Sequence, residues 1–561
     1  MRDYRRRLAL LRKVLFILLV CLAVRLLYLQ AWRGELLGSE ARQNVVRTFP
    51  SQAPRGCVFD CRGRVLVRNQ PRYAFSIVAA SLDEPAAAVK ELARLAGLKP
   101  EQVRRLVQRC QTLPLEPLVI SHQLDRVQLA RLAEVQDRYP GARIEVFPIR
   151  EYPLGSLAAH VLGQVGEVDE AALAESHRGH FPGEWVGKDG LELSWDATLR
   201  GRPGTRVALV DVVGRPVREF EERPPVPGRN LHLTLDAELQ RVAEERLGAA
   251  LEELRWRNGE PGGGVAVAME VHTGKIRALA SLPSYEPGWF ATGISARQFA
   301  LLTRNPAAPL LNRAIGGAYP PASTFKLVTA AAALAQGLVR RGQRFYCEGA
   351  RMIGDVPFHC FVRSGHGWLT FEETLAHSCD VAYYDLGLKL GYEKLEQYAR
   401  DMGLGEPTGV DLPGEVGGNL PDEAWKLRTV GEKWYAGDDA NLSIGQGFLT
   451  VTPLQMAVVT AVVASGGSVV RPYLVERVTD PSGAVVEEVR PRVVRQVPVP
   501  RAAWERIRRG MEAAVAYGTS TRANVWGLEI AGKTGTVENL ASAENRQGRN
   551  HTWFVCYAPA R

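Results

Sequence analysis

The stretch STFKLVTAAAALAQG occupies residues 323–337 and has the composition of a buried helix. Two prolines precede it and Gly337 closes it, so a helix is predicted to begin just after Pro321. Ser323 and Lys326 are three positions apart and would share one face of that helix. A serine hydroxyl is a weak nucleophile until a base removes its proton. Lys326 is the only charged residue of the stretch, and we predict that its amine reaches the Ser323 hydroxyl.

Two shorter motifs follow further along the chain. Ser378 and Asp380 place a hydroxyl two residues from a carboxylate, and a Lys-Thr-Gly-Thr motif stands between the strand-like runs VWGLEIAG and TWFVCYAP. Glycine in such a strand lets a substrate backbone lie close, while lysine and threonine offer a cation and donors for a substrate carboxylate. In this order, the three motifs resemble the active-site set of penicillin-binding proteins and serine β-lactamases. The candidate substrate-binding residues are Lys533, Thr534, Gly535 and Thr536.

The length of 561 residues allows two or three domains with cores of their own. The net charge is +9, and the six basic residues and one acidic residue of positions 1–13 hold +5 of it. No basic stripe interleaved with aromatic residues occurs elsewhere, so we expect no nucleic-acid partner.

Residues 14–32, VLFILLVCLAVRLLYLQAW, form an apolar run directly after the basic tail. As a helix this run would be about 28 Å long, enough to cross a bilayer core. Arg25 can extend toward the headgroups, and Tyr28 and Trp32 suit a membrane interface. No cleavage site follows, so we predict an uncleaved signal anchor with residues 1–13 in the cytoplasm.

The rest of the chain has two compositions. Residues 33–230 are rich in strand patterns and Gly/Pro turns, with a helical insert at 83–136. From residue 231 onward, helical and strand-like segments lead to the Ser323 helix. We therefore predict a non-catalytic pedestal at 33–230 and a catalytic domain at 231–561.

Several segments resemble the class B penicillin-binding proteins, and among them the cell-elongation branch, penicillin-binding protein 2. Asp380 stands where many relatives carry Asn, although the elongation branch often has Asp. The segments that carry the resemblance are RGCVFD at 55–60, REYP at 150–153, GLE at 190–192, AYPPASTFK at 318–326 and SIGQGFLTVTPLQMA at 443–457.

This resemblance implies an α+β multidomain protein. It would have a single N-terminal transmembrane helix, a β-rich pedestal with a helical insert, and a transpeptidase (penicillin-binding) domain whose antiparallel sheet is flanked by helices. Because the sequence stops at Arg561, the last strand and C-terminal helix usual in the family are expected to be missing.

The resemblance also implies a D,D-transpeptidase that cross-links peptidoglycan without a cofactor for catalysis. Ser323 would attack the penultimate D-Ala carbonyl of a donor stem peptide, and an amine of a neighbouring stem would resolve the acyl-enzyme. Lys326 would act as base, Ser378 would relay a proton to the leaving amine, and Asp380 would orient Lys326 or the donor backbone. The N–H groups of Ser323 and Thr536 would form the oxyanion hole.

Alternative functions fit the sequence less well. A free β-lactamase or D,D-carboxypeptidase needs no anchor or pedestal, and a β-lactam-sensing receptor usually needs further membrane helices. Within the family, a division-site transpeptidase is the main alternative, while the Tyr319–Ser323 segment and Asp380 favour elongation. The family lacks a glycan polymerase domain. The implied partners are therefore a multi-spanning SEDS-type glycosyltransferase and other elongation-complex proteins at the bacterial inner membrane.

Three cysteines and one histidine fall between the first two motifs: Cys347, Cys360, His366 and Cys379. Outside the cytoplasm, the default for Cys347 and Cys360 is a disulfide, which would leave Cys379 as an odd thiol. Three thiolates and an imidazole also form a Cys3His set for structural zinc. Some elongation-type relatives resemble this chain in having metal ligands at corresponding positions, and we therefore favour zinc over the disulfide.

Overall fold

The computed structural model describes residues 2–32, 46–79, 82–112, 117–121, 124–139, 142–169, 171, 173, 180–181, 183–210, 216–258, 262–537 and 550–560. The chain divides into two compact units. The first comprises Met1–Pro54, Gln70–Ile149 and Gly201–Pro227, and the second comprises Arg55–Asn69, Arg150–Arg200 and Gly228–Arg561. The units therefore interleave along the sequence and do not meet at a single boundary.

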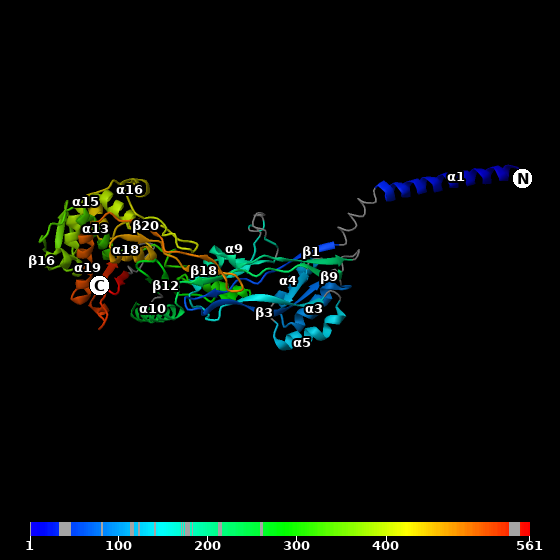
Figure 1. Cartoon of the computed structure of the whole chain (residues 1–561), viewed down its shortest axis with the longest axis horizontal. Coiled ribbons are helices and arrows are strands. Elements are labelled where there is room, and N and C mark those ends of the chain that lie inside the picture. Colours follow the sequence, from blue (N-terminus) through cyan, green and yellow to red (C-terminus); the bar gives the residue numbers. More distant parts are fainter. Residues whose placement is uncertain are drawn as a thin grey trace. The chain divides into compact units, whose positions relative to one another are not determined.

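In its described residues, the first unit contains two sheets and, besides the N-terminal helix Arg2–Leu27, three α-helices. β1, β8 and β9 form an antiparallel sheet, and the later part of β3 pairs with β4 and β5. α3 and α4 pack on β4, and α5 packs on α3 (Figure 1), as the helical insert at 83–136 predicted. The bounds are β1 (Val46–Ser51), β3 (Val65–Val78), α3 (Pro85–Leu95), α4 (Pro100–Thr112), β4 (Pro117–Ser121), α5 (Arg126–Val135), β5 (Ala142–Glu151), β8 (Gly204–Val210) and β9 (Pro216–Arg223).

α3 contributes one apolar face to the core of this unit. Its buried residues Ala88, Val89, Leu92 and Ala93 recur at spacings of three and four, which places them on one face of the helix. They pack in one cluster with Phe75 and other apolar residues of the paired strands.

The N-terminal segment is helical. α1 spans Arg2–Leu27, and a π-helical turn follows at Tyr28–Trp32. The large apolar side chains between Leu10 and Tyr28 are exposed. Among the described residues, no helix is both long and apolar enough to cross a membrane, so the span predicted at residues 14–32 is not confirmed.

The second unit begins with short elements and the strands that pair with them. These are β2 (Val58–Phe59), α6 (Ala159–Leu162), β6 (Val165–Glu167), β7 (Trp185–Gly187), α8 (Gly190–Ser194), α9 (Asp196–Leu199), β10 (Asn230–Leu233), β18 (Val475–Thr479) and β19 (Val485–Glu488). Within this unit the strand order is β19-β18-β10-β2, followed by the first part of β3.

The remaining elements surround the three motifs. The strands are β11 (Gly264–Met269), β12 (Ile276–Leu282), β13 (Arg344–Cys347), β14 (Ala350–Ile353), β15 (Val356–His359), β16 (Gly367–Thr370), β17 (Ser468–Val470), β20 (Val493–Gln496), β21 (Ala531–Val537) and β22 (His551–Tyr557). The helices are α10 (Ala237–Asn258), α11 (Gly288–Ala291), α12 (Ala296–Thr303), α13 (Lys326–Ala335), α14 (Phe371–Ala376), α15 (Asp380–Asp401), α16 (Glu423–Thr429), α17 (Ala436–Ser443), α18 (Pro453–Ser465) and α19 (Arg501–Ala516).

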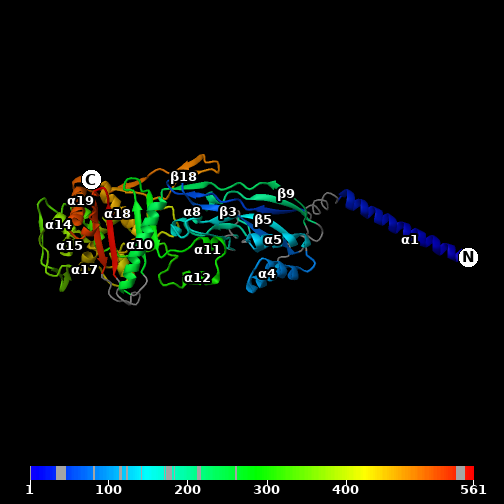
Figure 2. The ribbon, with the colours of Figure 1, turned by 90° about the horizontal axis from the view of Figure 1, so that it is seen from below.

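Antiparallel strand pairs flanked by helices form this part of the second unit, as predicted. β11 pairs with β12, and β21 pairs with β22. α10 lies along both β11 and β12 (Figure 2), while α13, α18 and α19 pack on one another. The fully buried side chains of Phe325, Tyr383 and Trp504 belong to the apolar core between these helices, which makes the Ser323 region part of a rigid interior.

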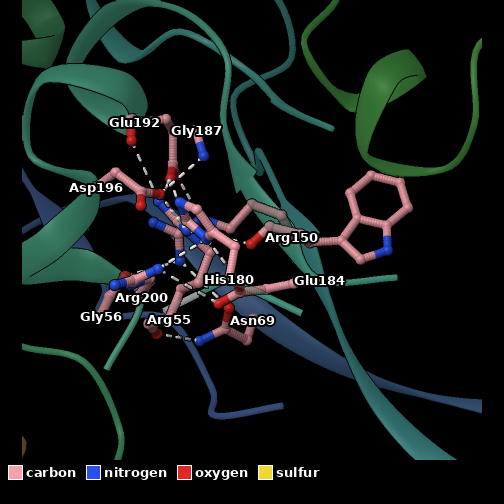
Figure 3. A network of polar contacts seen from close by, with 11 residues as sticks. Arg55, Gly56, Asn69, Arg150, His180, Glu184, Gly187, Glu192, Asp196 and Arg200 are labelled. Atoms are coloured by element: carbon pink, nitrogen blue, oxygen red, sulfur yellow. Dashed lines mark hydrogen bonds and ion pairs between the residues drawn. The ribbon is translucent and has the colours of Figure 1, made fainter. Parts of the chain in front are cut away.

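A buried polar network joins three of the segments that resemble the penicillin-binding proteins (Figure 3). Glu192 accepts hydrogen bonds from Arg55 Nε at 2.9 Å and from Arg150 Nε at 2.6 Å. Arg55 Nη1 also donates to Asp196 at 2.8 Å, and Arg150 Nη1 donates to the Gly56 carbonyl at 2.7 Å. Burial would raise the pKa of Glu192, but the Arg150 and Arg55 guanidiniums hold it below its ordinary value. The network therefore ties distant parts of the second unit together through one ionised carboxylate.

Candidate active site

Ser323 lies in a tight turn at the entrance to α13. Ala322–Thr324 form a 3-10 turn, and the α-helix itself begins at Lys326. A helical turn thus begins just after Pro321, as predicted, but it is a 3-10 turn and the α-helix starts only at Lys326. Ala322 has a left-handed φ of 51°, and its N–H donates to the Gly445 carbonyl at 2.8 Å.

Lys326 is fully buried and has three hydrogen-bond acceptors. Its Nζ donates to the Ser378 carbonyl at 2.8 Å, to Asp380 Oδ1 at 2.7 Å and to Ser378 Oγ at 3.3 Å. Nζ also lies 5.3 Å from the centroid of the Tyr383 ring. The sequence predicted contact with Ser323, whereas these bonds connect the first motif to the second.

Ser378 stands at the junction of α14 and α15. Its φ of 52° is unusual for a residue with a side chain, and such conformations persist where the surroundings enforce them. The Cys379 N–H donates to the Thr374 carbonyl at 2.9 Å, and Asp380 Oδ2 accepts the N–H of Phe361 at 3.1 Å. These bonds hold the Ser378 hydroxyl and the Asp380 carboxylate toward Lys326.

The third motif lies on β21, as predicted. Lys533 is fully buried, and its Nζ donates to Ser378 Oγ at 2.8 Å and to the Thr534 carbonyl at 2.9 Å. Burial lowers the pKa of Lys533 well below its ordinary value, the charge of Lys326 lowers it further, and Asp380 opposes both. Ser378 Oγ thus accepts hydrogen bonds from two lysines.

The rest of the Lys-Thr-Gly-Thr motif borders the Ser323 turn. A Cβ added to Gly535 would lie 3.0 Å from the Pro321 carbonyl oxygen, so a larger residue would force β21 and the turn apart by a few tenths of an ångström. Thr534 Oγ1 donates to Thr519 Oγ1 at 2.8 Å, and the Thr536 side chain is exposed. Two buried amines therefore meet at the Ser378 hydroxyl, and the strand that carries Lys533 borders the Ser323 turn.

Comparison with known families identifies this arrangement. Residues 50–233 match the model described as "Penicillin-binding Protein dimerisation domain", and residues 264–561 match that described as "Penicillin binding protein transpeptidase domain". Peptidoglycan D,D-transpeptidase MrdA of Acinetobacter baumannii is 32% identical over 580 residues, which covers 100% of this chain and 83% of that protein. The chain belongs to the MrdA family of penicillin-binding proteins.

Solved structures agree with membership in the MrdA family. One solved structure is described as "Structural coordination of polymerization and crosslinking by a peptidoglycan synthase complex". A chain in that structure is 31% identical to this one and superposes with a TM-score of 0.72. The match covers 98% of this chain and 92% of that chain. Penicillin-binding protein 2 of Helicobacter pylori, in complex with MreC, has a TM-score of 0.76 at 24% identity, covering 92% and 93%. The likeness to the Helicobacter pylori protein confirms that this chain has the penicillin-binding protein fold.

The four metal-ligand candidates of this MrdA family member do converge. The ligand atoms of Cys347, Cys360, His366 and Cys379 lie within 4.8 Å of one another, and the three cysteines are buried. All three thiols are free, so the alternative disulfide between Cys347 and Cys360 is not formed. Hydrogen bonding to Cys379, and then to His366, lowers the pKa of the Cys360 thiol. A thiolate among soft ligands at this separation fits a tetrahedral Cys3His zinc site.

Sequence reasoning missed several residues that support the motifs. Tyr383 carries the ring next to Lys326, Thr519 bonds the third motif, and Gly445 accepts the N–H of Ala322. One signal was available for Tyr383: it follows Asp380 by three residues on α15, so both lie on the same helix face. Thr519 and Gly445 reach the site through tertiary contacts that no local pattern encodes.

Proposed function

We propose that this protein is a serine-type peptidoglycan D,D-transpeptidase that cross-links stem peptides during cell elongation. The observation that carries the proposal is the convergence of Lys326 and Lys533 on the Ser378 hydroxyl, together with the closeness of β21 to the Ser323 turn. Relatives named MrdA at this level of identity support the elongation branch over the division-site alternative.

The proposed reaction is acyl transfer. Ser323 Oγ attacks the penultimate D-Ala carbonyl of the donor stem, and its proton passes into the Lys326–Ser378 pair as the C–N bond to terminal D-Ala breaks. Ser378 returns that proton to the leaving amine. An amine of a second stem then attacks the ester. Its C–N bond forms as the C–O bond to Ser323 breaks, and the proton that the amine loses passes to Ser323 Oγ, which restores the free serine. The hydrogen bond between Lys326 and Ser378 supports this proton path.

Substrate recognition is assigned to β21. Lys533, Thr534 and Thr536 would hold the terminal carboxylate of the donor stem, and the N–H groups of Ser323 and Thr536 would stabilise the oxyanion. The closeness of Gly535 to the Ser323 turn supports this assignment, because a substrate lying along β21 then passes the nucleophile.

Labelling of the full-length protein with a fluorescent penicillin tests the proposal. We expect wild type to form a covalent adduct and Ser323→Ala to form none. Ser482→Ala, in an exposed turn away from the motifs, serves as the matched control and should label like wild type. An adduct of undiminished yield on the Ser323→Ala protein would exclude Ser323 as the nucleophile.

Membrane attachment and partners form a second part of the proposal. We propose that residues 14–32 anchor the chain in the inner membrane with the catalytic part outside the cytoplasm; the exposed apolar side chains of α1 support this. A relative with 31% identity occurs in a peptidoglycan synthase complex, which supports a separate SEDS-type glycosyltransferase as partner. Polymerisation of lipid-linked precursor by the purified chain alone would contradict this division of labour.

A structural zinc ion at Cys347, Cys360, His366 and Cys379 completes the proposal. Zinc would fix the backbone around Cys379, the residue between Ser378 and Asp380. Elemental analysis of protein purified without chelator should give about one zinc per chain, and Cys360→Ser should lower both the zinc content and the melting temperature. Cys556→Ser, an exposed thiol outside the cluster, should change neither. Zinc-free protein with the melting temperature of the zinc-loaded form would refute the site.

A further inference from the structure

A pocket of about 370 Å³ lies beside a break in α15. The break is at Gly391, whose φ of 70° and ψ of 163° interrupt the helix. The pocket belongs to the second unit and contains none of the motif residues. Its walls combine aromatic rings with carboxylates: Tyr392, Trp434, Tyr435, Glu393, Glu423 and Asp439.

The aromatic walls are held in place by the fold. The ring centroids of Tyr392 and Trp434 are 5.0 Å apart, and the Trp434 indole N–H donates to Asp439 Oδ1 at 2.9 Å. Tyr435 already faces Lys426, whose Nζ lies 4.8 Å from its ring centroid. Among the described residues, no Lys or Arg lies over the ring of Tyr392 or Trp434 as Lys426 does over Tyr435. A bound cation could use these two rings, because aromatic rings attract cations through their electron-rich faces.

The charged side chains that line the pocket are all acidic. Lys426 is the nearby cation, and it is committed to Asp438 at 2.6 Å and lies 3.8 Å from Glu432. In the described part of the chain, Glu393, Glu423 and Asp439 form no ion pair. Burial, followed by the charges of Glu393 and Glu423, raises the pKa of the Tyr392 hydroxyl, as expected in an uncompensated negative field.

We propose that this pocket binds the primary ammonium group of a peptidoglycan stem peptide and is a second substrate-binding site of the transpeptidase. The proposal rests on the function proposed above. An ammonium is a compact cation that pairs with carboxylates and also lies against aromatic faces. Carboxylates that have no ion-pair partner and lie next to aromatic rings therefore suit the binding of an ammonium group.

The position of the pocket explains which amine it holds. α15 begins at Asp380 in the active site and reaches Leu390 at the pocket ten residues later, about 15 Å at 1.5 Å per residue. α17, which contributes Asp439, ends at Ser443, whose carbonyl accepts the Thr329 hydroxyl of α13 at 2.7 Å. The pocket is thus separated along α15 from the residues of the second motif, and we assign the bound amine to a neighbouring stem peptide and not to the amine that attacks the acyl-enzyme. The two helices that frame the active site also frame the pocket, which favours the substrate over a protein partner.

Binding measurements on penicillin-acylated full-length protein test this site, because acylation keeps ligands out of the active site. The probe is a fluorescent synthetic stem peptide with a free side-chain amine, compared with the same peptide after acetylation of that amine. We expect at least 10-fold weaker binding of the acetylated probe and a similar loss with the Glu393→Gln/Glu423→Gln double variant. Both glutamates are exposed, so this variant should fold and react with penicillin normally. Glu487→Gln, an exposed acid on β19, should bind the probe like wild type.

Three outcomes would overturn the proposal. They are equal binding of the free and acetylated probes, unchanged binding by the double variant, and binding of an unrelated lysine-rich peptide in place of the stem peptide, which would assign the pocket to a protein partner. Failure of wild type to react with penicillin would instead refute the proposed function, so the two failures are distinguishable.

Discussion

Lys533 is a fully buried amine that donates to Ser378 Oγ, while the nearby carboxylate of Asp380 pairs with Lys326. Burial lowers the pKa of Lys533 well below its ordinary value. The unfolded chain keeps this proton up to pH ~10.4, so wild-type stability should rise with pH between the folded and unfolded pKa values. Burial of the Lys533 amine thus costs stability at neutral pH, where the unfolded chain binds the proton more tightly than the folded chain does.

Lys533→Met tests this balance. Because methionine fills similar volume without a charge to bury, the variant should melt at the same or a higher temperature than wild type at pH 7. The difference should shrink as the pH rises and vanish only above pH ~10.4, where the amine is neutral in both states. Penicillin acylation should fall at least ~10-fold, as expected when a charge-assisted hydrogen bond is lost. Lys99→Met, at an exposed position, should leave both quantities unchanged, and a large loss of stability only in Lys533→Met would contradict the argument.

The sequence named Ser378, Asp380 and Lys533 from motif order, and the structure places the first two against Lys326 and Lys533 against Ser378. Their catalytic roles stay predictions. The partner of Lys326 was not predictable, because spacing along a helix shows only neighbours on that helix. Ala322 likewise gave no local sign of its left-handed φ, which a tertiary bond to Gly445 supports.

At the scale of elements, the close approach of β21 to the Ser323 turn depends on Gly535. An alanine Cβ there would meet the Pro321 carbonyl oxygen at 3.0 Å and Thr324 Cγ2 at 3.2 Å. Gly535→Ala should therefore push the strand from the turn, cost about 1–3 kcal/mol of stability and slow penicillin acylation. Denaturant unfolding and labelling rates measure the two effects.

A glycine with room around it is the control for that experiment. A Cβ at Gly248 in α10 would have Leu282 Cδ1 at 3.8 Å as its nearest neighbour, so Gly248→Ala should be neutral or stabilise the helix by about 0.5–1 kcal/mol. Equal effects of the two substitutions would show that the approach of β21 does not depend on Gly535.

For the whole molecule, the interleaving of the two units is the feature that the sequence could not supply. Composition changed near residue 230, and a single boundary was the natural prediction. Residues 55–69 and 150–200 nevertheless belong with the C-terminal part. Arg55, Arg150 and Glu192 were recognised as parts of family-like segments, but their mutual contacts span 42 to 137 residues of sequence, far beyond any helical or strand period.

Glu192 holds these long-range contacts together, and its loss should affect the whole second unit. Glu192→Gln would leave two buried guanidiniums facing an uncharged amide. Removing one partner of a buried ion pair costs about 3–5 kcal/mol of folding stability. Glu151→Gln, which breaks the more exposed pair with Arg68, should change stability little.

Because the pKa of Glu192 is lowered in the fold, the stability that this carboxylate contributes is present above its unfolded pKa of ~4.3. That stability is lost as the pH falls through the folded pKa. Chemical unfolding at pH 7 and at progressively lower pH should therefore show a large gap between wild type and Glu192→Gln that narrows on acidification. A gap that widens, or one no larger than for Glu151→Gln, would mean that the arginines are stabilised by other groups.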